Sequence, residues 1–391
     1  MRALITFIFL LFFVCTYAQT DSTIIPEKKK TVTLNGYVKN LNGMLLLPND
    51  QSAQWGLLHN RINSKWKPNK NFIVALDVRN RIVYGESVKL GNYPSSMLDK
   101  DGGLVDATFL PFDSKVAKMI SSVERLWTKI SNDKLELTLG RQRINWGVNL
   151  VWNPNDIFNT YSFVDFDYEE KPGSDAAVLK YNISTMSSIT AAAKVGKYRN
   201  DDVYALMYKL NKWNYDFQFL TSWYEKDIAA GLGWAGSIGN VGFKGEGTYF
   251  LPRKNNSTTA DVINTSIEFD YTFNGKVYAN ASYLFFNRGL VSTSSLPGNL
   301  LLNNASISAK QMSHSKHSAF LQLKSISNPI FSGGISAIYF FEINTMYLFP
   351  SLTYSINDSL EAALFIQSVC LIQQKIKSEM NNVMIRIKCS F

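Results

Sequence analysis

The chain ends with Val383-Met384-Ile385-Arg386-Ile387-Lys388-Cys389-Ser390-Phe391. Apolar residues and Cys389 occupy the odd-numbered positions of this stretch, and Arg386, Lys388 and Ser390 occupy even-numbered ones, with Met384 as the exception. A period of two places successive side chains on opposite faces of a β-strand. The stretch therefore predicts a strand with one apolar face and one cationic face, ending on an aromatic residue.

A terminal strand of this kind resembles the closing strand of bacterial outer-membrane β-barrels, whose last phenylalanine is part of the signal read by the barrel-insertion machinery. The resemblance implies that Phe391 is a barrel-assembly signal and that the insertion machinery is a partner. From this stretch alone, an edge strand of a soluble β-protein remains the alternative.

Residues 1–18 have the order of a secretory signal peptide: a positive start at Met1-Arg2, an apolar run over 3–14, and small residues before Gln19. The run is shorter than the roughly 20 residues that a membrane-spanning helix needs. We expect residues 1–18 to be a signal peptide, 19–30 to form a polar periplasmic arm, and 31–391 to form one outer-membrane β-barrel.

The composition fits such a barrel. No apolar run after Ala18 approaches the length of a spanning helix, so a membrane location would require a closed barrel. Aromatic residues make up 13% of the chain, and girdles at the two membrane interfaces would use them. The net charge of +9 fits a cationic lumen, attraction to anionic lipid, or simply a basic surface.

Strand-like alternation recurs along the whole chain from Thr31, and its clearest case is 72–84. Phe72, Val74, Leu76, Val78, Ile82 and Tyr84 share one face, and Asp77, Arg79 and Arg81 share the other. This pattern is typical of a barrel wall with lipid outside and water inside. We predict about eighteen strands, or sixteen, near 31–39, 56–66, 71–84, 119–130, 134–143, 175–184, 188–197, 203–213, 215–224, 229–238, 241–251, 261–273, 276–288, 318–326, 331–343, 347–356, 360–372 and 383–391.

The connections between these strands alternate in length. Tight turns such as Asn274-Gly275 and Gly239-Asn240 would face the periplasm, and their residues suit β-hairpins. Longer connections at 40–55, 85–118, 144–174, 252–260, 289–317 and 373–382 would face outside. Short periplasmic turns with longer outer loops are typical of an antiparallel up-and-down transmembrane barrel, whereas a soluble sandwich has no reason to show them.

The most distinctive segment begins Leu139-Gly140-Arg141-Gln142-Arg143-Ile144-Asn145-Trp146-Gly147 and continues through Asn153-Pro154-Asn155-Asp156-Ile157-Phe158. Over 139–181 it resembles a run in porin-like outer-membrane β-barrels of an uncharacterised Gram-negative family. The resemblance implies that a long loop, residues 144–174, folds into the barrel mouth and constricts it. Trp146, Trp152 and Phe158 would let this loop pack rather than move freely in solvent.

Charged residues near this loop are candidates for the pore constriction. Acidic Asp156, Asp165 and Asp167 could face Arg79, Arg81, Arg141 and Arg143, with Asp77 also lining the pore. The alternative is a loop that only plugs the barrel, with those charges paired together. Arg141 and Arg143 follow the lipid-facing leucines of their strand, so either they lie beyond the apolar band or a bulge at Gly140 turns them inward.

The sequence thus predicts an outer-membrane channel for passive passage of small solutes. The alternative is a non-conducting surface barrel that binds polysaccharide through its outer loops. A barrel esterase using Ser313 or Ser315 with His314 has little support. We expect no catalysis, cofactor, metal or nucleic-acid partner, and we expect contact with outer-membrane lipid.

Overall fold

The computed structural model describes residues 31–48, 51–91, 101, 103–160, 173–198, 201–253, 260–289, 308–372 and 376–391. The predicted signal peptide and periplasmic arm lie outside these residues. In the part of the chain that the structure describes, antiparallel strands dominate, and there is one short helix, α2 (Glu86–Lys89). Within the described residues, no helix is long and apolar enough to cross a membrane.

The strands are β1 (Val32–Leu46), β2 (Ser52–Asn69), β3 (Phe72–Gly85), β4 (Thr108–Asp113), β5 (Ala117–Ser131), β6 (Leu135–Gln142), β7 (Ser174–Ser184), β8 (Ser187–Lys194), β9 (Val203–Lys212), β10 (Tyr215–Tyr224), β11 (Asp227–Ile238), β12 (Val241–Pro252), β13 (Val262–Phe273), β14 (Val277–Phe286), β15 (His317–Ser325), β16 (Phe331–Phe340), β17 (Thr345–Ser355), β18 (Leu360–Ile372) and β19 (Ile376–Ser390).

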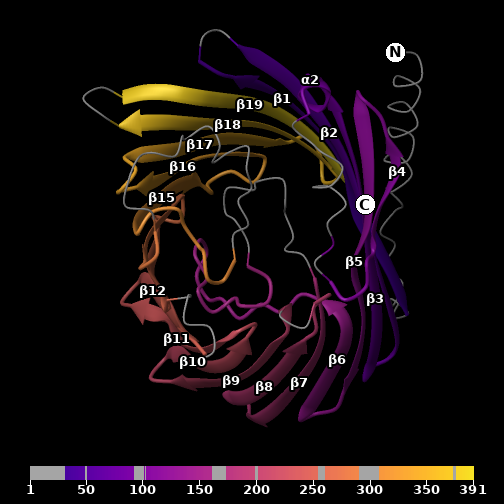
Figure 1. Ribbon diagram of the computed structural model, residues 1–391, viewed down its shortest axis with the longest axis vertical. Coiled ribbons are helices and arrows are strands. Elements are labelled where there is room, and N and C mark those ends of the chain that lie inside the picture. Colours follow the sequence, from indigo (N-terminus) through magenta and orange to yellow (C-terminus); the bar gives the residue numbers. More distant parts are fainter. Residues whose placement is uncertain are drawn as a thin grey trace.

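Consecutive strands pair along the chain, and β1 also pairs with β19, so the sheet closes into a ring (Figure 1). Strand β4 pairs with β5 beyond the end of β6, on the same edge of β5. It is therefore an addition to the wall, and the other eighteen strands form the closed ring. At the seam the Phe391 amide donates to Gly36 O at 3.0 Å, and the Gly36 amide donates to Phe391 O at 2.9 Å. The predicted antiparallel barrel and its even strand number are confirmed.

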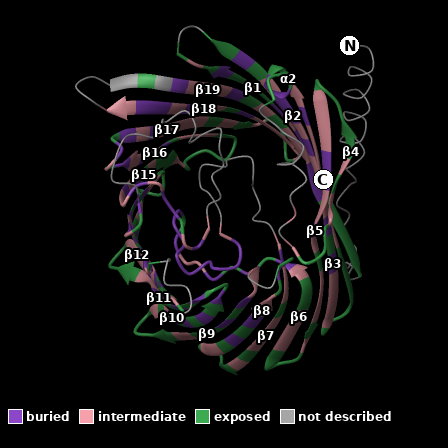
Figure 2. Cartoon of the chain, in the orientation of Figure 1, coloured by how far each residue is buried: buried purple, intermediate pink, exposed green. Residues whose placement is uncertain are grey.

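The two faces of the wall follow the predicted alternation. On β19, Ile385 and Ile387 are more than half exposed on the outside, whereas Met384 is fully buried inside. On β3, Asp77 and Arg79 are buried inside the ring. Exposed leucine, isoleucine and aromatic side chains therefore cover the outer surface, and the buried clusters lie within the ring (Figure 2).

Two predicted outer loops are shorter than expected, because β1 extends to Leu46 and β19 begins at Ile376. The reason at β1 is that Asn40 and Asn42 interrupt the apolar alternation. These side chains hydrogen-bond each other, and the Tyr84 hydroxyl donates to Asn42 Oδ1 at 2.9 Å, so the strand continues through them. Because two asparagines occupy outward positions that are usually apolar, the alternation of the sequence does not predict this part of the strand.

Candidate functional site

The segment 143–160 leaves β6 and runs inside the ring rather than outside it (Figure 1). Its apolar side chains Ile144, Trp146, Ile157 and Phe158 are buried against the inward faces of β8 to β14. The rings of Trp146 and Phe158 meet edge to face, with centroids 4.9 Å apart. The predicted inward-folded loop is thus present, held by aromatic and aliphatic packing over the part of it that the structure describes.

The middle of the segment packs on a second part of the wall. Val151 and Trp152 are buried with residues of β14 to β18, and the ring centroids of Trp152 and Phe320 are 6.4 Å apart. Figure 2 shows that this inner segment is largely buried. The segment therefore spans two neighbouring regions of the inner wall and narrows the space beside it.

Two wall carboxylates hold the backbone of the segment. Glu246 on β12 accepts hydrogen bonds from the amides of Val148, Asn149 and Asn155, the last two at 2.8 and 2.9 Å. Glu268 on β13 accepts the amide of Leu150 at 2.8 Å. An irregular segment inside a protein has backbone donors that no strand or helix satisfies, and unpaired buried donors are costly. These glutamates supply the missing acceptors, and both are almost completely buried.

Asn155 inserts its side chain between strands of the wall. Its Nδ2 donates to Leu232 O at 3.0 Å, and the Thr248 hydroxyl donates to its Oδ1 at 2.8 Å. A Cβ atom on Gly231 would lie 2.5 Å from Asn155 Oδ1, and one on Gly233 would lie 2.9 Å from Nδ2. The two glycines thus make room for the segment on the inward face of β11.

We expect Gly231→Ala to push Asn155 out of its site and to lower stability by about 1–3 kcal/mol, the usual cost of overpacking. The matched control is Gly247→Ala on the outward face, where the nearest atom is a Thr265 methyl at 3.2 Å. Thermal unfolding in detergent would compare the two variants. Equal transition temperatures would contradict a close fit between segment and wall.

A second group of charges lies on the opposite inner wall, on β2, β3 and β5. Arg61 is almost fully buried and contacts Asp77 at 3.1 Å and Glu124 at shorter range; Arg79 contacts Glu124 at 2.7 Å. A register shift between Asp77 and Val78 inserts the extra residue Glu124 opposite β3. This bulge lets Glu124 and Arg125 both reach inward, and Arg125 lies 3.6 Å from Asp77.

Cationic side chains outnumber carboxylates on the inward face of this wall, among the strand residues that the structure describes. Strand register places Lys388 beside Lys39, and Arg386 beside Leu41, on the inward face. The inward cations of β19, β1, β2, β3 and β5 at this level are Lys39, Arg61, Arg79, Arg81, Arg125, Arg386 and Lys388, and the nearby inward carboxylates are Asp77, Glu124 and Glu361.

A recess of about 280 Å³ lies between the start of the inner segment and the wall, and Arg143, Lys180 and Lys209 line it. A second recess of about 540 Å³ shares Lys180 and Lys209 and extends to Thr185 and Met186 in a periplasmic turn. Glu136 is the carboxylate in the first recess, and it contacts Lys129 and, at 3.7 Å, Lys180. Arg143, Lys180, Lys209 and Glu136 therefore line the first recess, and the second recess adds the carboxylate of Asp216.

The structure distributes the predicted pore residues unevenly. Asp77, Arg79 and Arg81 lie on the inward wall, and Arg143 lines the recess beneath the segment, so their role in solute passage stays a prediction. Asp156 is fully buried in the packed segment, which removes it from an open constriction. Asp165 and Asp167 lie outside the described residues. Phe391 lies at the seam, and its role in assembly stays a prediction.

Arg141 requires a correction, because it does not face the lumen. Its partner in the register is Asp175, two residues from Ala177, which register places on the outward face with Leu139 and Ala193. Arg141 Nε contacts Asp175 and Nη1 contacts Asp101, each at 2.7 Å. Gly140 has a φ of 109° without a register shift, so no bulge turns the arginine inward. Arg141 instead lies beyond the apolar band, where outer residues cover its charge.

The sequence reasoning missed Glu246, Glu268, Arg61 and Glu124. The available signal was position: Glu246 and Glu268 are acidic residues at inward positions of β12 and β13. Their partners lie about a hundred residues away along the chain, so no local pattern could identify them. The hydroxyls near His314 have other partners: Ser315 hydrogen-bonds Glu342, and Ser313 pairs with Ser318.

Comparison with known proteins places this geometry among solved structures. No protein-family model matches the chain, and no curated protein sequence matches it. Acinetobacter baumannii OccAB4 is similar with a TM-score of 0.59 at 11% identity, over 94% of this chain and 100% of that one. The fold is that of a porin-like outer-membrane β-barrel.

Two Pseudomonas aeruginosa structures show the same fold. OccK8 (OprE) has a TM-score of 0.57 at 10% identity, over 92% of this chain and 98% of that one. OpdK, solved with vanillate, has a TM-score of 0.55 at 9% identity, with the same two coverages. At these identities the similarity carries the porin-like fold, and the arguments about solutes depend on this chain's own residues.

Proposed function

We propose that this protein is a passive channel of the cell outer membrane that admits small solutes and favours anions. The observation that carries the proposal is the segment 143–160, which Glu246 and Glu268 hold across the inside of an eighteen-strand ring. A ring of this size encloses an aqueous passage unless loops fill it. Because the segment is fixed to the inner wall, it narrows this passage.

The preference for anions follows from the inner charges. Three cations, Arg143, Lys180 and Lys209, line the recesses below the segment, together with two carboxylates, Glu136 and Asp216. Fixed charges lining a narrow passage raise the local concentration of ions of opposite sign. The vanillate in the OpdK structure is an aromatic carboxylate, which is the solute chemistry that we propose for this chain.

Planar-bilayer recording of the purified barrel under a salt gradient tests both parts of the proposal. We expect a stable conductance with a reversal potential that indicates anion preference. Arg143→Glu combined with Lys180→Glu should shift the reversal potential toward cations, because two positive charges become negative, a net change of four charge units beside the passage. The matched control is Lys212→Glu, whose ammonium lies over the Trp213 ring at the periplasmic end.

The outcomes separate the two functions that the sequence allows. An unchanged reversal potential in the double variant would show that ions do not pass along Arg143 and Lys180, although the barrel would still be a channel. A correctly folded barrel that passes no current would instead favour a non-conducting surface barrel that binds polysaccharide. Transport rather than catalysis is the activity that we propose.

A further inference from the structure

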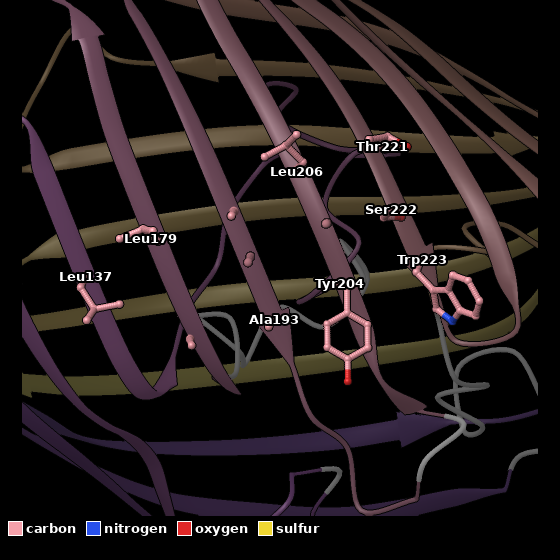
Figure 3. A pocket seen from close by; sticks show the side chains of 12 residues that line it. Leu137, Leu179, Ala193, Tyr204, Leu206, Thr221, Ser222 and Trp223 are labelled. Carbon is pink, nitrogen blue, oxygen red and sulfur yellow. The ribbon is translucent and has the colours of Figure 1, made fainter.

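The outer surface of the barrel carries a hollow across β6 to β10 (Figure 3). Its volume is about 540 Å³, and small side chains form its base, among them Ala177, Ala191 and Ala193. Register places these alanines on the outward face: Ala177 pairs with Leu139 and with Ala193, and Leu179 pairs with Ala191. The wall is therefore locally thinner on the side that faces lipid.

Larger side chains border the hollow on both sides. Leu137 and Leu179 lie on one side, and Tyr204, Leu206 and Trp223 lie on the other (Figure 3). The lining is mostly apolar, and its residues with hydroxyl groups are Tyr204, Thr221 and Ser222. A hollow of this chemistry inside a lipid-facing wall suits a hydrocarbon chain better than water, because it offers few hydrogen-bond partners.

The aromatic side chains fix the depth of the hollow. The Tyr204 hydroxyl donates to Asp202 Oδ2 at 3.3 Å, and Trp223 Nε1 donates to Glu225 O at 3.1 Å. Both acceptors belong to outer connections of the barrel. Tyrosine and tryptophan place their polar ends toward water at a membrane interface. The hollow therefore begins at the outer interface and extends into the outer-leaflet half of the wall.

The cationic side chain of Arg253 lies at the outer end of the hollow. The Arg253 guanidinium lies over the Trp223 ring, 4.0 Å from its centroid, and Arg253 makes no salt bridge with any residue that the structure describes. A guanidinium pairs with phosphate through parallel hydrogen bonds, and it does so while stacked on an aromatic face. The apolar hollow and the cation above it match an amphiphile with an anionic head.

We propose that this hollow binds an acyl chain of a phosphorylated glycolipid of the lipid A type, with a phosphate on Arg253. The proposal depends on the membrane location within the proposed function, since the hollow must face the outer leaflet. It requires no current through the barrel. The glycolipid is favoured over a second copy of the chain because the hollow ends at an exposed cation rather than in a continuous apolar surface.

Native mass spectrometry of the detergent-solubilised barrel, titrated with hexa-acylated bisphosphorylated lipid A, tests the proposal. We expect one lipid A to be retained per barrel. Ala193→Phe fills the hollow, and Arg253→Glu removes the cation without filling it; each should weaken retention by about tenfold or more, equivalent to about 1.4 kcal/mol. The controls are Ala281→Phe on the outward face of β14 and Lys89→Glu on α2, which should bind as the unaltered chain does.

Folding is checked independently by the shift in gel migration on heating, so a failure to fold cannot pass for a failure to bind. Retention unchanged in both hollow variants would overturn the proposal. Equal retention of phosphatidylglycerol would overturn the glycolipid assignment and indicate ordinary boundary lipid. A dimer that Ala193→Phe abolishes and lipid A does not affect would assign the hollow to a second copy. Binding with no conductance would reject the channel and leave the lipid site in place.

Discussion

Replacing Glu246 and Glu268 together by glutamine should release the segment 143–160 from the wall and increase the single-channel conductance. Each carboxylate accepts backbone amides that have no strand or helix partner. A hydrogen bond to a charged group contributes about 1.5–3 kcal/mol, so one lost bond at each glutamate removes about 3–6 kcal/mol. About 5.5 kcal/mol suffices to move a two-state equilibrium from 1:99 to 99:1.

Glutamine is the right replacement because it keeps the volume of glutamate while removing the charge and one acceptor oxygen. The apolar contacts of Trp146 and Trp152 remain in the variant, so we expect stepwise conductance fluctuations as the segment leaves and returns. The matched control is Glu361→Gln, an inward carboxylate that pairs with Arg386 and contacts no part of the segment. A double variant that folds and conducts like the unaltered chain would show that packing alone holds the segment.

Replacing Glu124 by glutamine should cause the largest loss of stability in the wall. Glu124 contacts both Arg61 and Arg79, and all three side chains are nearly inaccessible to solvent. Removing one member of a buried ion pair costs up to about 3–5 kcal/mol, and Arg61 keeps its second partner, Asp77. We expect the barrel to lose its folded gel migration at a clearly lower temperature, measured by stepwise heating before electrophoresis.

The control for this prediction is Glu136→Gln, whose pairs with Lys129 and Lys180 are partly exposed. Pairs in contact with water contribute about 0–1 kcal/mol. The two variants therefore make the same chemical change at different depths. Similar transition temperatures would mean that water reaches Arg61 and Arg79. The charges around Glu124 would then not form a buried network.

Several features of this protein follow from its sequence alone. The alternation in 72–84 and 383–391 identifies wall strands and their faces, because side-chain direction in a strand reverses at every residue whatever the strand packs against. The alternation of short and long connections identifies the two ends of the barrel. The aromatic content of 144–174 identifies a segment that must pack against something. All of these signals lie within one strand, one hairpin or one loop.

The tertiary structure decided which residues meet. Glu246 and Glu268 become anchors only because β12 and β13 lie beside the inner segment, about a hundred residues away along the chain. Arg141 pairs with Asp101 and Asp175 outside the lumen, and Asp156 is buried. The sequence gives the charge of each residue, but it does not give the residue with which that charge pairs. The partner depends on register, ring closure and the path of a loop, which are properties of the whole wall.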